Sequence, residues 1–253
     1  MLRLLVILIC IVPSIDAHAI VGGALEAGAI GNHIVMILGR RDNRGTLCTG
    51  TVLTRDLVLT AAHCVAPKGG YRVLAGNRAG SSIISSVALH PRYDERNYSR
   101  GKVTADVALI KLEKPLPISI KPATLATVES SAVTTGDRVV IAGFGVVVAG
   151  RDESAGVAHT AALVATGRPG SLQIRLVDPA TRGERTGLGG CIGDSGGPAF
   201  REVGGQLAIV GVVSWSTGPA DSEGCGGMTG VTPLILYRSW LVEQATKMGS
   251  SIK

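Results

Sequence analysis

Short apolar runs rich in β-branched residues, separated by glycine, proline and polar residues, constrain the fold of this chain more than any other sequence feature. Runs of this length, punctuated at regular intervals, are typical of β-strands rather than helices. We therefore expect an all-β fold. The expected strands cover residues 34–38, 51–53, 57–60, 71–75, 82–89, 107–112, 138–142, 171–176 and 207–214.

Two segments depart from this pattern. Pro115, Pro117 and Pro122 interrupt the middle of the chain and predict a crossover linker near residues 115–130. After Pro233, apolar residues recur at close to helical spacing and predict a C-terminal α-helix within residues 234–248. The apolar positions of this helix are Leu234, Leu236, Tyr237, Trp240, Leu241 and Ala245.

The first 19 residues have the pattern of a secretory signal peptide. Arg3 precedes an apolar run over residues 4–12, and Ala17-His18-Ala19 fits a small-x-small cleavage site. A buried strand or an uncleaved membrane anchor is the alternative interpretation, but the run is short for a bilayer span. We expect a signal peptide over residues 1–19 and an exported mature chain over residues 20–253. Cys10 would be discarded with the signal.

Composition limits the class of partner. The net charge is +6, and the basic residues are spread along the chain, which favours a solvated basic surface over a polyanion-binding patch. We expect no nucleic-acid partner. Aromatic residues make up only 3% of the chain, and this composition together with the short signal suggests a bacterial exported protein. The basic residues include Arg40, Arg41, Arg92, Arg96, Arg100, Lys102, Arg182 and Arg185.

Four cysteines remain after removal of the signal, namely Cys48, Cys64, Cys191 and Cys225. An even number in an exported chain predicts two disulfides. The count alone leaves all three pairings open.

Three motifs supply the groups of a nucleophilic catalyst in the order His, Asp, Ser. His63 lies in Thr-Ala-Ala-His-Cys, Asp106 precedes Val-Ala-Leu-Ile, and Ser195 lies in Gly-Asp-Ser-Gly-Gly followed by Pro198. A hydroxyl becomes a useful nucleophile when an imidazole takes its proton and a carboxylate orients that imidazole. A glycine-rich turn is the alternative for the serine motif alone, and a turn-capping carboxylate is the alternative for Asp106.

With these motifs in place, the chain resembles the trypsin/chymotrypsin family of serine endopeptidases. Ile20-Val21-Gly22-Gly23 looks like the mature N-terminus of the family, and Ser214-Trp215 looks like its substrate-binding strand. The resemblance implies two antiparallel six-stranded β-barrels with the active site between them and a C-terminal α-helix. The N-terminal barrel is expected at about residues 20–120, and the second barrel and helix at about 121–253.

The resemblance also implies a role for each site residue. Ser195 is the nucleophile, His63 the general base and acid, and Asp106 the carboxylate that orients His63. The backbone N–H groups of Gly193 and Ser195 form the oxyanion hole. The expected disulfides are Cys48–Cys64 and Cys191–Cys225. No metal or other cofactor is expected.

The substrate pocket is expected to be neutral. The position at which trypsin-like relatives carry an aspartate is Gly189, followed by Gly190, and Ser216 and Gly230 map to the pocket walls. The strand Ser214-Trp215-Ser216 should pair with substrate, although the Trp215 side chain could equally be packed in the core. Asp221 and Glu223 are interpreted as solvated loop charges, with the pocket rim as the alternative.

Asp194 is expected to pair with the free α-amine of Ile20 and so to order the site. Because the expected signal cleavage after Ala19 directly precedes Ile20, export itself would create that amine, with no separate activation cut.

The resulting hypothesis is an exported serine endopeptidase, secreted or periplasmic. It prefers uncharged, medium to large apolar residues over Lys or Arg at P1, the substrate residue before the cleaved bond. Expected partners are polypeptide substrates and protein inhibitors of proteases. We expect a monomer without a stable membrane anchor after signal removal. The alternative is a catalytically weak, protease-like binding protein.

Overall fold

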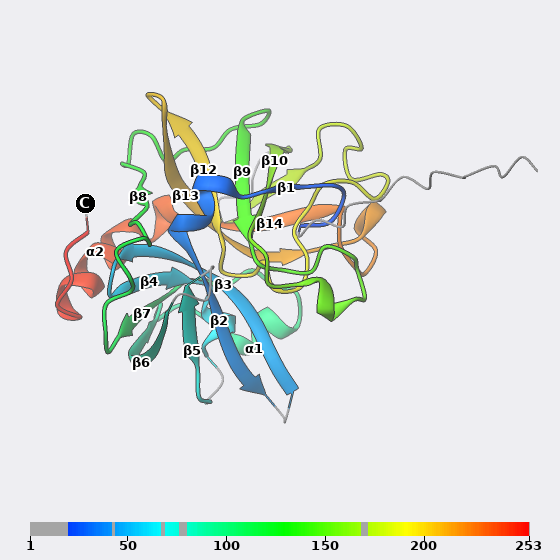
Figure 1. The fold of residues 1–253 in the computed structure, drawn as a ribbon. Helices are drawn as coiled ribbons and strands as arrows, with labels where there is room; N and C mark the ends of the chain where they lie inside the picture. The colour runs from blue at the N-terminus through cyan, green and yellow to red at the C-terminus, as the bar shows by residue number, and fades with distance from the viewer. Residues whose placement is uncertain (1–19, 42–43, 67–68, 76–79, 168–171, 253) are drawn as a thin grey trace, which may run out of the picture.

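The computed structural model describes residues 20–252 except 42–43, 67–68, 76–79 and 168–171. The expected signal peptide over residues 1–19, with Cys10, lies outside the described residues. Two β-barrels lie side by side (Figure 1), which confirms the expected fold class. In the described part of the chain, no helix is long and apolar enough to cross a membrane.

The first barrel closes in the strand order β2-β3-β4-β7-β6-β5, with every neighbouring pair antiparallel. Its centre is β4, a four-residue strand of Leu and Val ending in Thr60, in which every residue is buried. The strands are β2 (Ile34–Arg41), β3 (Arg44–Thr54), β4 (Leu57–Thr60), β5 (Arg72–Ala75), β6 (Ser81–Leu89) and β7 (Ala108–Leu112).

The second barrel follows the order β10-β11-β14-β13-β12-β9 and closes because β9 also pairs with β10. Each of its pairs is antiparallel. The strands are β9 (Arg138–Gly143), β10 (His159–Ala165), β11 (Ile174–Val177), β12 (Pro198–Val203), β13 (Gln206–Ser216) and β14 (Met228–Pro233).

Two further short strands join the second barrel, and one of them comes from outside its expected range. Near the N-terminus, β1 (Leu25–Glu26) pairs with β10, and in the linker β8 (Thr124–Leu125) pairs in parallel with β13. The expected first-barrel range of about 20–120 includes β1, whereas the structure pairs β1 with the second barrel. The N-terminal segment is thus fastened to the half of the molecule that carries Ser195.

The C-terminal helix α2 (Arg238–Lys247) packs against the first barrel. Leu241 and Ala245 are fully buried in the same apolar cluster as Leu109 and Ile110 of β7. The helix starts later than the apolar spacing predicts, because residues 234–236 form a single 3₁₀ turn after Pro233. This helix links the end of the second barrel to the outside of the first (Figure 1).

Besides the short β1 and β8, three barrel strands and one short helix are not predicted by the sequence pattern. In β12 the first residue is Pro198, β14 contains Gly230 and ends at Pro233, and β10 has three alanines, all poor strand signals. The helix α1 (Glu95–Ser99) has no apolar face to predict it.

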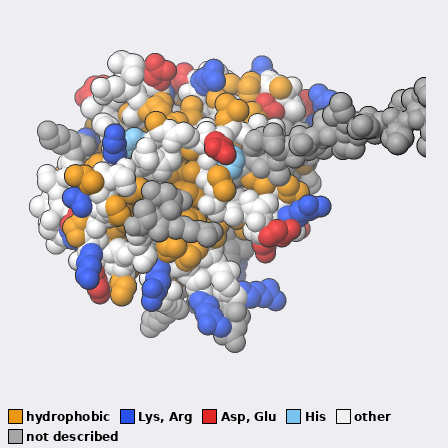
Figure 2. Space-filling model, in the orientation of Figure 1, with side chains coloured by type: hydrophobic (Ala, Val, Ile, Leu, Met, Phe, Trp, Pro, Cys, Tyr) orange, Lys and Arg blue, Asp and Glu red, His pale blue; other side chains and the backbone are white. Residues whose placement is uncertain are grey.

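The basic side chains do not gather into one patch on the face of the molecule in Figure 2. The described Lys and Arg side chains there are spread over separate positions, as the charge pattern favours.

Candidate active site

Asp106 and His63 meet at one end of the first barrel. His63 lies in a 3₁₀ turn directly after β4, and Asp106 lies two residues before β7, so the β4–β7 pairing brings them together. Asp106 Oδ1 accepts a hydrogen bond from His63 N (2.9 Å), and Oδ2 accepts one from His63 Nδ1 (2.8 Å). Asp106 is buried, and its Oδ2 also accepts the Ser214 hydroxyl (2.5 Å). These contacts fix the imidazole with its proton on Nδ1 and its Nε2 toward the cleft.

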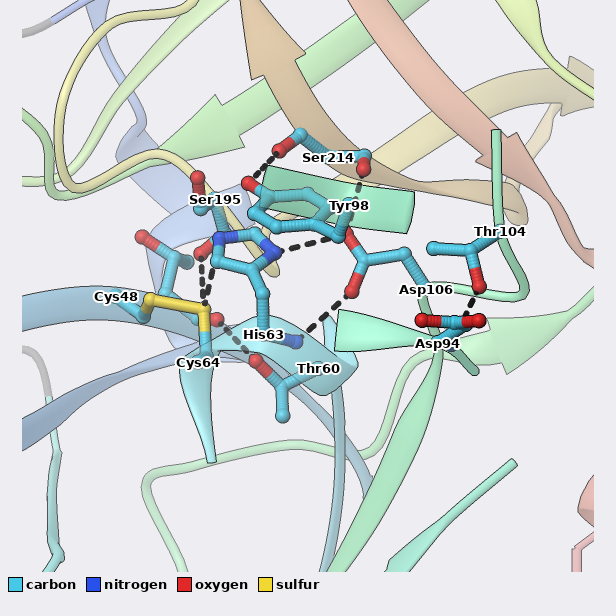
Figure 3. Close-up of polar contacts among 11 residues, drawn as sticks. Cys48, Thr60, His63, Cys64, Asp94, Tyr98, Thr104, Asp106, Ser195 and Ser214 are labelled. Atoms are coloured by element: carbon cyan, nitrogen blue, oxygen red, sulfur yellow. Dashed lines mark hydrogen bonds and ion pairs between the residues drawn. A yellow bond between two sulfur atoms is a disulfide. The ribbon is translucent and has the colours of Figure 1, made fainter. Parts of the chain in front are cut away.

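Ser195 reaches the same cleft from the second barrel. It lies in the glycine-rich loop before β12, and Figure 3 shows it on the Nε2 side of the His63 ring, opposite Asp106. Among the described residues, the Ser195 hydroxyl makes no hydrogen bond, so it is free to engage His63 or a ligand. The structure therefore brings the three motif residues together at the seam between the barrels.

Thr49 of β3 holds the Ser195 loop against the first barrel, and no sequence signal marked it. Its N–H donates to the Ser195 carbonyl (2.8 Å), and its hydroxyl donates to the Gly193 carbonyl (2.8 Å). The same hydroxyl accepts the N–H of Phe144 (3.0 Å). A Cβ on Gly196 would lie 2.2 Å from the Thr49 carbonyl oxygen, so this loop can dock only with glycine there.

The backbone N–H groups of Gly193 and Ser195 are two donors close to the Ser195 side chain. The Ile192 carbonyl accepts a hydrogen bond from Val146 N (2.8 Å), and in a trans peptide the N–H of Gly193 then points to the opposite side. Gly193 has a φ of +97°, which a side chain would disfavour. Within the described residues, neither the Gly193 nor the Ser195 N–H has a protein acceptor, which leaves both available to an anion.

Two disulfides join the same pairs that the resemblance implies. Cys48–Cys64 tethers the His63 turn to β3, and Cys191–Cys225 ties the Ser195 loop to the segment before β14. Cys48, His63 and Cys64 also form the single His/Cys/Asp/Glu group in the described part of the chain that is compact enough for a metal. Both of its sulfurs are consumed by the disulfide, so it does not fit one.

The structure corrects one expected pocket residue. Gly230 does not line an open pocket, because a Cβ there would lie 1.9 Å from the Trp215 indole, which packs over it. Successive strand residues face opposite sides, and it is Thr229 that faces Gly190. The Thr229 hydroxyl accepts Gly190 N (2.9 Å), and a Cβ on Gly190 would lie 3.2 Å from the Thr229 methyl group. The fully buried Thr229 therefore takes up space beside Gly190, where the substrate pocket is expected, and neither Gly189 nor Gly190 adds a charge there.

The edge of β13 runs past this pocket and lines a neighbouring cleft of about 620 Å³. Its register with β14 shifts between Val213 and Trp215, so Ser214 is an unpaired bulge residue. Trp215 and Ser216 are both half-buried. Asp221 lines the same cleft as Trp215, which places it at the rim, and Glu223 is exposed.

Asp194 is a fully buried carboxylate beneath the Ser195 loop. Its oxygens accept Gly145 N and Cys191 N, both at 2.9 Å, yet burial outweighs these bonds and raises its pKa to about 7. Ile20 is also fully buried, and the adjacent Val21 forms a β-bridge with Gly189. With the Ala19–Ile20 bond intact, the nitrogen of Ile20 is an amide, so the expected ion pair requires cleavage there.

Tyr98 is a further site residue that the sequence did not reveal. It lies in α1 among charged and polar residues, where nothing distinguishes it from a surface tyrosine. Its ring is stacked on His63 (Figure 3).

Known proteins resemble this chain over most of its length. The Trypsin family model matches residues 20–241. A serine protease of Anopheles gambiae is 33% identical over 209 residues, covering 74% of this chain and 69% of the relative. Trypsin-3 of Salmo salar is 29% identical over 207 residues, covering 77% and 81%. A vitellin-degrading protease of Bombyx mori is 29% identical over 224 residues, covering 79% and 77%. These three relatives come from animals and do not support the expectation of a bacterial source.

Burial of Asp194 predicts a specific pH dependence for the protein with the Ala19–Ile20 bond intact. The folded protein holds this proton more tightly than the unfolded chain, so it binds more protons between pH 3.8 and about 7. The free energy of unfolding should therefore fall as pH rises through that window, by at most about 1.4 kcal/mol per pH unit from this group. Urea unfolding at several pH values measures the effect. Asp194→Asn is the control and should remove this component, whereas identical pH profiles for the two proteins would contradict the assignment.

Proposed function

Since the chain belongs to the trypsin family and is a serine-type endopeptidase, we propose that His63, Asp106 and Ser195 are its catalytic triad. The observation that carries the proposal is the His63 Nδ1–Asp106 Oδ2 hydrogen bond of 2.8 Å, which leaves Nε2 on the side of the ring where Ser195 lies (Figure 3). His63 would take the Ser195 proton as the hydroxyl attacks the scissile carbonyl, and would then deliver that proton to the departing amine. Asp106 would stabilise the charge that develops on the imidazole.

The N–H groups of Gly193 and Ser195 are the proposed oxyanion hole. Their support is the bonded Ile192 carbonyl, which aims the Gly193 N–H away from Val146 and toward the cleft. Losing one such donor typically costs about 3–4 kcal/mol of transition-state stabilisation. Ser214 would hold Asp106 through its hydroxyl, at 2.5 Å, while the edge of β13 pairs with the substrate backbone.

Catalysis by this triad has a direct test. Ser195→Ala should abolish labelling by a fluorophosphonate, and His63→Ala should lower peptide turnover by about four orders of magnitude or more, because the nucleophile loses its base. Ser130→Ala, a serine outside the site, should leave both unchanged. The measurements are intact-mass detection of the adduct and turnover of a peptide amide. Undiminished turnover in Ser195→Ala would end the assignment and favour the protease-like binding protein.

The pocket geometry supports a small, uncharged P1 residue rather than the large apolar residue expected from Gly230. Thr229 occupies space beside Gly190 that an open pocket would offer to the substrate. Gly189 supplies no carboxylate for Lys or Arg. Because an apolar pocket discriminates by about 1–3 kcal/mol per methylene, the preference should be graded rather than absolute.

A peptide panel that varies only P1 tests this preference. Ala and Val should be cleaved faster than Phe and Arg, and Thr229→Gly should raise the rate for Leu and Phe relative to Ala by about ten-fold or more, since the pocket deepens. Thr232→Val, on the same strand but facing the opposite side, should leave the profile unchanged. A wild-type profile dominated by Arg and Lys would defeat the proposal and direct attention to Asp221 and Glu223.

We also propose that export activates the enzyme. Removal of residues 1–19 would leave the Ile20 amine, and a buried Asp194 whose pKa is raised to about 7 is the group that such a cation would stabilise. The pair would order the Ser195 loop from below, because Asp194 bonds Cys191 N and Gly145 N. The mature protein would act as a secreted monomer, without a membrane anchor, on polypeptides, and protein inhibitors would occupy the same cleft.

The first residue of the exported protein tests the proposal that export activates the enzyme. Mass-spectrometric sequencing of the exported protein should find a start at Ile20, with no longer intermediate. One extra residue before Ile20 should lower activity by about 100-fold or more without unfolding the chain, because half of a buried pair left alone costs about 3–5 kcal/mol. Ile20→Val keeps the amine and should stay active. A longer, inactive secreted form that needs a second cut would contradict activation by export.

A further inference from the structure

Tyr98 contacts two groups of the proposed site, the His63 ring and the Ser214 carbonyl. Its ring is nearly parallel to the His63 imidazole, with ring centroids 4.4 Å apart and an angle of 11° between the planes. Its hydroxyl donates a 3.2 Å hydrogen bond to the carbonyl oxygen of Ser214. Figure 3 shows both contacts, with Tyr98 lying over His63 and reaching Ser214. One side chain therefore covers the proposed base and holds a backbone acceptor beside it.

The Ser214 carbonyl is a backbone acceptor at the part of β13 where an added strand is proposed to pair. Ser214 is the bulge residue between two register positions of β13 and β14, so it has no partner residue on β14. A peptide that pairs with this edge must donate an N–H to a carbonyl here. In the structure, the Tyr98 hydroxyl already makes that bond.

Hydrogen bonds within the loop that carries Tyr98 fix the conformation of that loop. Asp94 caps α1 by accepting the N–H groups of Arg96 (2.9 Å) and Asn97 (3.0 Å). The Asp94 N–H donates to the Thr104 hydroxyl (2.7 Å), which closes the loop at its base, two residues before Asp106. Burial raises the pKa of the Tyr98 phenol, so the hydroxyl keeps its proton and remains a donor. The loop thus delivers a permanent hydrogen-bond donor to the Ser214 carbonyl.

We propose that Tyr98 is a self-blocking residue that peptide substrates must displace from Ser214 and His63 before they can be cleaved. The inference rests on the proposed function, because it assumes that substrates pair with the edge of β13. The hydroxyl competes only with ligands that donate to the Ser214 carbonyl. Small reagents that reach Ser195 without using that carbonyl do not have to displace it. Tyr98 consequently selects for extended peptides that replace the lost bond.

The experiment compares an extended peptide amide with a small fluorophosphonate on the mature protein. Tyr98→Phe keeps the ring and removes the competing hydrogen bond, so kcat/KM for the peptide should rise about five-fold, mainly through a lower KM. The second-order rate of fluorophosphonate labelling should stay within about two-fold, because the reagent reaches Ser195 without using the Ser214 carbonyl. Tyr98→Ala removes the ring as well and should lower KM at least as much. Tyr93→Phe removes a phenol hydroxyl from the same loop and should change neither measurement.

The outcomes separate this inference from the proposed function. Normal labelling of every variant, with a peptide KM that is unchanged or higher in both Tyr98 variants, would overturn the self-blocking role and leave the triad intact. Failure of the wild-type protein to label or to cleave peptides would overturn the proposed function, and the self-blocking role with it. A lower KM in both Tyr98 variants, with unchanged labelling and an unchanged Tyr93→Phe control, supports the inference.

Discussion

Docking of the Ser195 loop onto the first barrel is the constraint on which the site depends. The proposed nucleophile, Ser195, and its proposed base, His63, belong to different barrels, so neither barrel alone can set their separation. Thr49 does so with both backbone and side chain, by bonding the carbonyl groups of Ser195 and Gly193 at 2.8 Å. Gly196 permits the approach, because any Cβ there would collide with Thr49 and Thr60. Relative movement of the barrels would have to break these buried bonds.

Ser214 contacts both the residues that orient His63 and the residue proposed to control substrate entry. Its hydroxyl holds Asp106, which holds His63, while its carbonyl is held by Tyr98. Both functions follow from the bulge, which leaves this residue unpaired at the end of a long strand. The Ser214 hydroxyl therefore helps to hold Asp106 and His63 in place. Under the proposed self-blocking role, its carbonyl governs the entry of substrate.

Two regions of the second barrel contact the Ser195 loop, and they differ in charge. The pocket beside Gly190 is bounded by Thr229 and Val213 and carries no charge from Gly189 or Gly190. Beneath the loop, Asp194 is fully buried with two N–H donors, and its pKa is raised to about 7. Two hydrogen bonds do not offset the desolvation of a carboxylate in such a site. The Ser195 loop thus has an uncharged region beside Gly190 and a buried, incompletely stabilised carboxylate, Asp194, beneath it.

The sequence by itself determined the all-β fold and marked His63, Asp106 and Ser195 as the candidate catalytic residues, because strand composition and reactive groups are local properties. It also determined the glycine-rich character of the Ser195 loop. The tertiary structure alone decided that Thr229 rather than Gly230 faces the pocket, since strand side chains alternate and a bulge in the neighbouring strand shifts the register. It likewise decided the positions of Thr49 and Tyr98, whose contacts are with residues more than ninety positions away or across a loop. Such contacts arise only when the two barrels pack.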